Sequence, residues 1–409
     1  MAQQTGAPAR RSGIWSPGFL RLWSGSTASG LATWALPFVL GLAVLDGTIT
    51  PVTLGIVLAA RSVGFLIAMP VGGVLADRAA RRRVVRDASL IAAAGIPLIV
   101  AGLAQGVALM VAGAAIAGIG QGACRPAYQA LVPLVVGRGA LQPANAAMSI
   151  SVRVTNLVGP ALATALALAL GVPAALLVVG ALWLVSAFAP PHPAEPARPD
   201  ARLTLARFRR DLIEGVQEAR RHPWFVAGLG ALTVVVALGY SASGVVLPIV
   251  SRDAYGDARL LVAATTAYTA GALLGAVLIA RWRPRNQGWA ALAALALYGL
   301  VPLSLLVPTY IAIPVIAFFL AGIGIELFNV PWFTATQREV PPERLARVSS
   351  LDFLLSYGFA PLGLAVIAPA GQAFGFAAVL AVCGVACLLA PLAAMLPRSS
   401  RDFTASPPA

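Results

Sequence analysis

The sequence predicts an all-α polytopic membrane protein with twelve transmembrane helices, arranged as two six-helix halves related by a parallel pseudo-repeat. Three observations predict this fold: the composition, the alternation of long apolar runs with arginine-rich loops, and motifs that recur in the second half. Of the 409 residues, 59% are hydrophobic and only 11% are charged. Soluble domains carry about a quarter charged residues, so the composition excludes a soluble globular protein and indicates a bilayer.

Twelve apolar runs are long enough to cross a membrane, which takes about twenty residues. We expect transmembrane helices at 19–43, 51–75, 87–104, 107–132, 142–169, 172–189, 223–250, 258–280, 288–307, 310–335, 347–369 and 373–396. The chain then divides into an N-terminal tail (1–18), a first half (19–189), a central loop (190–222), a second half (223–396) and a C-terminal tail (397–409).

The loop arginines predict the orientation. Loops on the side of both termini hold nearly all of them, whereas the opposite loops hold only Arg252 and Arg259. Arginine-rich loops stay in the cytoplasm, so both termini are expected to be cytoplasmic. Every basic residue is arginine, which together with the Ala and Gly content suggests a GC-rich bacterial genome and hence the bacterial cytoplasmic (inner) membrane. The net charge of +14 is spread over these loops, so it does not indicate nucleic-acid binding.

The central loop opens with a proline-rich run and continues with a predicted amphipathic helix. Apolar residues recur there at helical spacing beside arginines, at Leu205, Phe208, Leu212, Val216 and Ala219. This pattern predicts a helix lying at the membrane surface. The only histidines, His192 and His222, also lie in this loop, and without further ligands nearby they do not indicate a metal site.

The pseudo-repeat is visible in short motifs. Ala117-Gly-Ile-Gly120 recurs as Ala321-Gly-Ile-Gly324, and Gln129-Ala-Leu-Val-Pro133 recurs as Gln337-Arg-Glu-Val-Pro341. Parallel repeats of this kind place a substrate site between the two halves, near the middle of the membrane.

Ionisable residues within the expected helices are the first candidates for a transport site, because a charge in hydrocarbon normally faces a cavity or a partner. They are Arg61, Arg125, Glu326 and Asp352, with Arg153 as a weaker fifth. Glu326 is the only carboxylate expected near a helix midpoint. Burial disfavours its charged form, which makes it our first choice for proton coupling.

Each of these residues also has a structural interpretation. Glu326 could form an ion pair with Arg61 or Arg125, and those arginines could instead balance an anionic group of the substrate. Arg125 could also tie its helix to the loops. We expect Asp352 to make a gating contact between the halves rather than to carry a proton.

The loop between the second and third helices carries Gly73-Val-Leu-Ala-Asp77-Arg78-Ala-Ala-Arg81-Arg82-Arg83. The spacing G-x-x-x-D-R-x-x-R-R resembles the loop 2–3 signature of the major facilitator superfamily of twelve-helix secondary transporters, although Ala80 stands where many members have glycine. The resemblance implies that Asp77 lies at the start of helix 11 when the cytoplasmic side is closed, so that the loop acts as a gate. The alternative is that these arginines serve only as an orientation signal.

Further motifs resemble the branch of siderophore exporters and macrolide-efflux proteins. They are Arg125-Pro-Ala-Tyr128-Gln129-Ala-Leu-Val-Pro133, Ala144-Asn145, Trp332-Phe-Thr334-Ala-Thr-Gln337-Arg-Glu-Val-Pro341 and Arg347-Val-Ser-Ser350. A further one, Asp211-Leu-Ile-Glu-Gly215 followed by Arg221-His222-Pro223, resembles the lead-in to helix 7 in bacterial efflux members. In helix 5, Gly159-Pro160 keeps half of an antiporter motif and could equally be a helix kink. Gly118 stands where many proton-coupled members have an arginine.

Together these features favour a secondary transporter that exports a small, partly apolar molecule, such as a drug, a secondary metabolite or a siderophore, by proton antiport. The alternative is a proton-coupled uptake permease of the same superfamily. A membrane enzyme is not expected, because no histidine lies in an expected helix. Without lysine the chain has no phosphate-binding Gly-Lys-Ser/Thr loop, so ATP-driven pumping by this chain alone is excluded. We expect no cofactor and no metal; the expected partners are the substrate, protons and the lipid bilayer, and the protein is expected to be a monomer.

Overall fold

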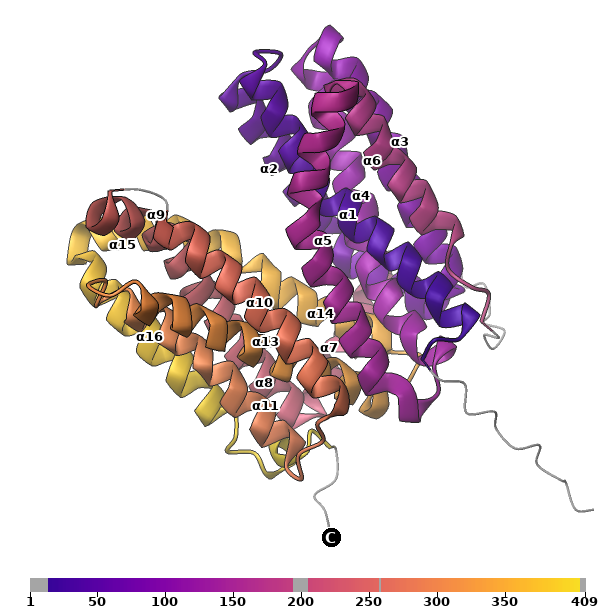
Figure 1. Cartoon of the computed structure of the whole chain (residues 1–409). Coiled ribbons are helices and arrows are strands. Elements are labelled where there is room, and N and C mark those ends of the chain that lie inside the picture. The colour runs from indigo at the N-terminus through magenta and orange to yellow at the C-terminus, as the bar shows by residue number, and fades with distance from the viewer. Residues whose placement is uncertain (1–13, 194–204, 257–258, 405–409) are drawn as a thin grey trace, which may run out of the picture.

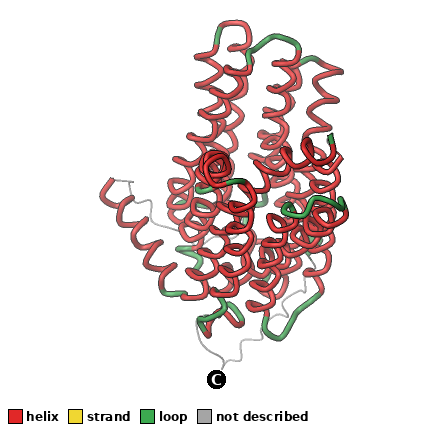
Figure 2. Tube along the Cα trace, turned by 90° about the vertical axis from the view of Figure 1, so that its left-hand side faces the viewer, coloured by secondary structure: helices red, strands yellow, loops and turns green. Residues whose placement is uncertain are grey.

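The computed structural model describes residues 14–193, 205–256 and 259–404, and this part of the chain is helices joined by short loops, without a strand (Figure 2). The helices are α1 (Pro17–Leu45), α2 (Pro51–Arg78), α3 (Arg81–Gln105), α4 (Val107–Val135), η1 (Arg138–Ala140), α5 (Leu141–Leu170), α6 (Val172–Phe188), α7 (Leu205–Arg220), α8 (Pro223–Val234), η2 (Val235–Tyr240), α9 (Ser241–Tyr255), α10 (Arg259–Arg281), α11 (Gln287–Ala296), η3 (Leu297–Gly299), α12 (Leu300–Ser304), α13 (Ala312–Glu339), α14 (Leu345–Gly358), α15 (Ala360–Phe374), α16 (Phe376–Ala393) and η4 (Arg398–Arg401).

Twelve spans are present in the described residues, which confirms the predicted fold class. Ten helical segments are long and apolar enough to cross a membrane, and α6 is a shorter apolar helix. The remaining span is the pair α14 and α15, which a break at Phe359 separates. A proline in the first turn of α15 explains the break, because proline lacks the N–H that would continue the hydrogen bonding of α14.

Two other predicted helices differ in detail. The span predicted at 223–250 runs from Pro223 to Tyr255 and contains the π-helical segment η2. The helix predicted at 87–104 begins six residues earlier, at Arg81, because the arginines assigned to the loop form its first turns. The connection between α2 and α3 is therefore only the two residues Ala79 and Ala80.

The recurring glycines perform the same packing role in both halves. A Cβ atom on Gly118 of α4 would lie 2.0 Å from the carbonyl oxygen of Arg61 in α2, and one on Gly322 of α13 would lie 2.1 Å from that of Tyr268 in α10. No side chain fits at these distances, so both helix pairs cross backbone against backbone. The second glycine of each motif packs in the same way against α3 and α11. The pseudo-repeat is thus a repeat of helix crossings.

The two halves meet at one end of the molecule and diverge toward the other (Figure 1). We call the converging end, where α2 ends and α7 lies, the α7 end. A large buried apolar cluster there contains residues of both halves, including Phe19, Leu131, Trp224 and Trp332. A second cluster, with Val39, Ile99 and Leu176 among its members, belongs to the first half alone.

The central loop contains α7 where the sequence predicts an amphipathic helix, and two acidic residues of α7 pack against the bundle. Asp211 and Glu218 are buried against the bundle, whereas Val216 is exposed. The acidic residues of α7 are buried because arginines of the bundle meet them, as described below. Residues 194–204, which include the end of the proline-rich run, lie outside the described part.

Candidate functional site

Asp77 sits at the centre of the contacts that join the halves at the α7 end. It follows the crossing of α2 over α14, where a Cβ on Gly73 would lie 2.5 Å from the Ser350 hydroxyl oxygen. The Asp77 carboxylate accepts hydrogen bonds from the backbone N–H groups of Ala346 (2.9 Å) and Arg347 (3.0 Å) and from the Arg347 guanidinium (3.0 Å). The first turn of α14 therefore caps a buried carboxylate of the opposite half, an arrangement that the positive end of a helix dipole favours.

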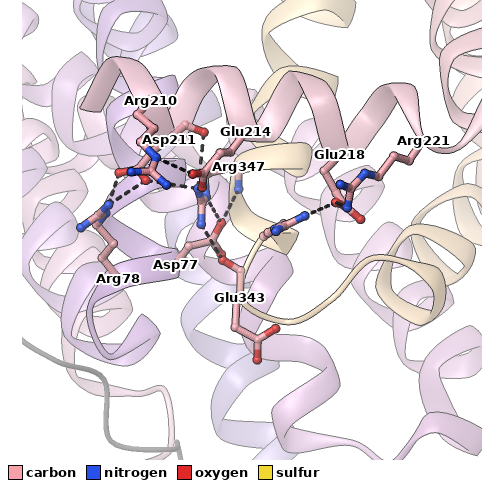
Figure 3. Close-up of polar contacts among 10 residues, drawn as sticks. Asp77, Arg78, Arg210, Asp211, Glu214, Glu218, Arg221, Glu343 and Arg347 are labelled. Atoms are coloured by element: carbon pink, nitrogen blue, oxygen red, sulfur yellow. Dashed lines mark hydrogen bonds and ion pairs between the residues drawn. The ribbon is translucent and has the colours of Figure 1, made fainter. Parts of the chain in front are cut away.

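Helix α7 extends this group of charges (Figure 3). Asp211 binds the guanidinium of Arg78 through both oxygens, at 2.5 and 2.7 Å, and also contacts Arg347. Glu214 accepts a hydrogen bond from Arg347 at 3.1 Å. We call these five residues, Asp77, Arg78, Asp211, Glu214 and Arg347, the charged network. It links α2, α7 and α14, so both halves and the central loop share one set of ion pairs.

Glu218 makes a neighbouring contact from α7 to the loop before α14. Its carboxylate binds Arg344 and lies 3.5 Å from His222. Burial raises the pKa of Glu218, but the hydrogen bond and charge of Arg344, with smaller contributions from His222 and Arg221, outweigh burial and hold this pKa below its usual value. Glu218 is thus an ionised anchor at neutral pH.

The arginines of the loop signature divide between the halves. Arg81, almost fully buried, donates to the carbonyl oxygen of Pro342 in the second half. Arg82 donates to the carbonyl oxygen of Pro190, at the start of the central loop, at 3.0 Å. Of the predicted gating residues, Asp77 and Arg81 thus make polar contacts with the second half and Arg78 with α7, while Gly73 permits the close helix crossing.

A layer of amide side chains lies next to the charged network. Asn145 of α5 donates to Gln337 of α13 at 2.8 Å and to Thr334 at 3.1 Å. Gln337 in turn donates to the side chain of Gln129 at 3.1 Å. Gln129 and Gln337 are equivalent positions of the pseudo-repeat, so the two copies of the motif meet between the halves. Gln142 adds a bond to the carbonyl oxygen of Trp282, at 3.0 Å.

The buried pair Arg153–Glu326 lies deeper in the bundle and joins α5 to α13. Arg153 Nε and Nη2 contact the same Glu326 oxygen, at 2.7 and 2.5 Å, and Arg153 also lies over the ring of Tyr268. Glu326 is 1% exposed, and its second oxygen has no hydrogen-bond partner among the described residues. Glu326 stands 14 residues from the start of α13 and 13 from its end. At 1.5 Å per residue these are depths of about 21 and 20 Å, close to the helix midpoint.

The other predicted residues make different contacts from those expected. Arg61 donates to the Gln121 amide oxygen at 2.9 Å and to the Thr33 carbonyl oxygen at 3.1 Å, so the described structure does not pair it with Glu326. Arg125 lies over the rings of Phe65 and Phe353, with 5.9 and 5.7 Å to the ring centres. Phe353 belongs to α14, so Arg125 contacts the opposite half through an aromatic ring.

Asp352 is bonded within its own half. It accepts hydrogen bonds from Trp332 at 3.2 Å and from Ser356 at 3.3 Å, and both donors belong to the second half. The inter-half contact expected of Asp352 is instead made by Asp77, because Asp352 lies two turns further into the helix and faces α13. In helix 5, α5 continues through Pro160, and Gly159 packs against Trp34 of α1.

Sequence reasoning underrated Arg153 and gave no role to Arg347, Asn145 or Gln337. Arg347, Asn145 and Gln337 lay in motifs that supported only the family resemblance, and so did Asp211 and Glu214 of α7. Among the described residues, no group of three or more His, Cys, Asp or Glu side chains could hold a metal ion.

A twelve-span helical fold whose buried charges and amides lie between two equivalent halves defines a multi-pass membrane transporter. The chain belongs to the Major Facilitator Superfamily, because the family model of that description matches residues 22–364. It is 26% identical over 283 residues to the uncharacterized MFS-type transporter YvqJ of Bacillus subtilis (strain 168). That match covers 67% of this chain and 66% of YvqJ, just under two thirds of the relative's length.

Solved structures share the fold. The human organic anion transporter MFSD10 (TETRAN) superimposes with a TM-score of 0.74 at 16% identity, covering 92% of this chain and 99% of that one. A bacterial homologue of the iron transporter ferroportin, in an outward-facing state, superimposes with a TM-score of 0.74 at 15% identity, covering 92% of this chain and 98% of that one. The transporter FucP in the outward conformation superimposes with a TM-score of 0.66 at 17% identity, covering 92% of this chain and 98% of that one.

Proposed function

We propose that the protein is a monomeric secondary transporter of the bacterial cytoplasmic membrane that exports a small, partly apolar molecule by proton antiport through alternating access. The buried pair Arg153–Glu326 carries this proposal. Its carboxylate lies near the midpoint of α13, with one oxygen held by an arginine of the other half and the other without a partner among the described residues. Such a carboxylate can take up a proton and thereby release its arginine.

The mechanism follows from the location of the contacts. In this structure the halves are joined at the α7 end, and Asp77 and its partners act as the closed gate on the predicted cytoplasmic side. A proton that reaches Glu326 from the opposite side neutralises it and weakens the link between α5 and α13. The halves then rock about this region, the α7 end opens, and the proton leaves toward the cytoplasm as substrate enters.

The inner surfaces suggest the chemistry of the substrate. Arg61 and Arg125 can meet an anionic group, and the rings of Phe65 and Phe353 offer an apolar surface. MFSD10 is described as an organic anion transporter, which agrees with this interpretation although its similarity shows only the fold. A partly apolar molecule with a negative group suits these residues best.

Glu326→Gln tests the proposal in an efflux-deficient bacterial host, over a panel of growth inhibitors with and without a protonophore. The wild type should raise the inhibitory concentration of at least one compound at least fourfold, and the protonophore should remove this effect. Glu326→Gln should abolish protection while the protein still reaches the membrane. Glu339→Gln, on the same helix but paired with its neighbour Arg338, is the matched control and should protect normally.

Three results would overturn parts of the proposal. Full protonophore-sensitive protection by Glu326→Gln would remove Glu326 from coupling. Increased rather than decreased sensitivity of cells that express the wild type would favour the uptake permease. Loss of Glu326→Gln protein from the membrane, with normal function of the little that remains, would assign the pair a structural role only.

A further inference from the structure

A basic pocket lies at the α7 end, between the start of α3 and the segment that follows α6. It has a volume of about 300 Å³ and is lined by Ala80, Arg82, Arg83, Arg86, His192 and Pro193. We call it the arginine pocket. None of its three arginines has a role in the transport mechanism described above.

The walls of the pocket are fixed by hydrogen bonds to the end of α6. Arg82 of α3 donates to the carbonyl oxygen of Pro190, and Arg21 of α1 donates to that of Ala189, each at 3.0 Å. Three helices are therefore tied together beside the pocket. The bonds orient the two guanidinium groups, which reduces the conformational entropy that a ligand must remove on binding.

The charge of the pocket is strongly positive. Arg82, Arg83 and Arg86 line the same pocket, so their guanidinium groups lie close together. The acid beside them, Asp87, pairs with Arg86 at 2.8 Å and is half exposed. Three lining arginines against one carboxylate leave an excess of positive charge, and guanidinium groups bind phosphate oxygens through paired hydrogen bonds.

An apolar surface continues from the pocket toward the middle of the membrane. Ile91 follows Arg83 by two turns of α3 and is 43% exposed. On α6, which packs against α3, Leu184 and Phe188 lie one turn apart and are 44% and 56% exposed. A ligand that fits both features combines a phosphate group with long apolar chains. An inorganic anion would use only the pocket.

We propose that the arginine pocket binds the phosphate headgroup of an anionic glycerophospholipid whose acyl chains lie along the outer faces of α3 and α6. The pocket lies at the ends of the spans, the depth of lipid headgroups, and basic pockets between helix ends recognise such groups. The bound lipid holds the end of α6 against α1 and α3, so it stabilises the first half directly above the central loop.

Lipid binding to the purified full-length protein in neutral detergent tests this proposal, by native mass spectrometry and by thermal melting. The probes are phosphatidylglycerol, zwitterionic phosphatidylcholine and inorganic phosphate. The variant is Arg83→Gln with Arg86→Gln, which spares the bonds of Arg82 and Arg21. The matched control is Arg283→Gln with Arg285→Gln, which removes two exposed arginines from the second half at the same end.

The wild type should bind phosphatidylglycerol in preference to phosphatidylcholine and melt at a higher temperature with it. The pocket variant should lose roughly tenfold to thirtyfold in affinity, as expected for two arginines near an anionic headgroup, while the control changes less than about twofold. Arg83→Gln alone provides a milder variant if the double change reduces recovery, and it should lose at least threefold. Wild-type affinity in the pocket variants, equal loss in the control, or equal stabilisation by inorganic phosphate would overturn the lipid assignment.

Discussion

Replacement of Asp77 by asparagine is the most direct test of the gate at the α7 end. The carboxylate accepts three hydrogen bonds from the first turn of α14, and its side chain is fully buried. An amide of the same shape keeps one acceptor oxygen and turns an NH2 group toward the remaining donors. If two hydrogen bonds to a charged acceptor are lost, at about 1.5 kcal/mol each, the closed state of the gate is destabilised by about 3 kcal/mol relative to the open state. The ratio of closed to open protein then falls about a hundredfold.

A cysteine placed at Ser350 provides the assay. Ser350 is fully buried beneath Gly73, where α2 crosses α14, so a thiol there should react with a maleimide only when the α7 end opens. We expect fast labelling in Asp77→Asn and slow labelling with native Asp77. Cys124 is buried inside the first half and serves as an internal control, because its labelling would indicate unfolding rather than opening.

Asp87→Asn is the matched variant, since it removes an exposed acid from the same end of the molecule. It should leave the labelling of the introduced thiol unchanged. Equal labelling rates in Asp77→Asn and the parent protein would refute the gate, and so would labelling of Cys124 in parallel with the introduced thiol.

Two further predictions concern stability. Gly322→Ala would place a Cβ 2.1 Å from the Tyr268 carbonyl oxygen and should destabilise the fold by about 1–3 kcal/mol or more, which would lower the melting temperature. Gly230 has open space around it, so Gly230→Ala is the control and should be neutral or slightly stabilising. Similar melting temperatures for the two variants would contradict backbone-to-backbone packing. Because the pKa of Glu218 is lowered in the fold, its anchoring of α7 should be complete above the usual pKa of glutamate and be lost as the pH falls through the lowered value. Proteolysis of α7 should therefore be faster in Glu218→Gln than in the wild type at pH 7, and equally fast at acidic pH; a constant difference at all pH values would argue against this titration.

The number and type of the spans could be predicted because each depends on local composition. A run of about twenty apolar residues can satisfy its backbone in a membrane only as a helix. The failures have local causes as well: the arginines after Ala80 continue α3, and the proline in the first turn of α15 divides a span that hydropathy alone makes continuous. The arginine run lowers the local hydropathy and so resembles a loop, whereas a single proline barely changes the mean hydropathy of a span.

The candidate site was predictable in its residue types but not in its pairs. An intramembrane carboxylate needs a partner, and Glu326 has one, but the partner is Arg153 rather than Arg61 or Arg125. That choice depends on how α5 crosses α13, 173 positions apart in the sequence. The burial of Asp211 in α7 could not be predicted for a similar reason, because it depends on arginines of α2 and α14. The way in which helices distant in the sequence align against one another leaves no periodic pattern in a single sequence.

The depth of Glu326 also has an electrical consequence. A proton bound about 20 Å along a helix of 28 residues has crossed roughly half of the membrane field. One elementary charge gains about 2.3 kcal/mol per 100 mV across the full field, so protonation of Glu326 from the outside would gain about 1.2 kcal/mol per 100 mV of inside-negative potential. That is about a sevenfold change in proton occupancy, equivalent to almost one pH unit. Membrane voltage alone would therefore contribute to the driving force for proton coupling at Glu326 in a cell whose two sides have the same pH.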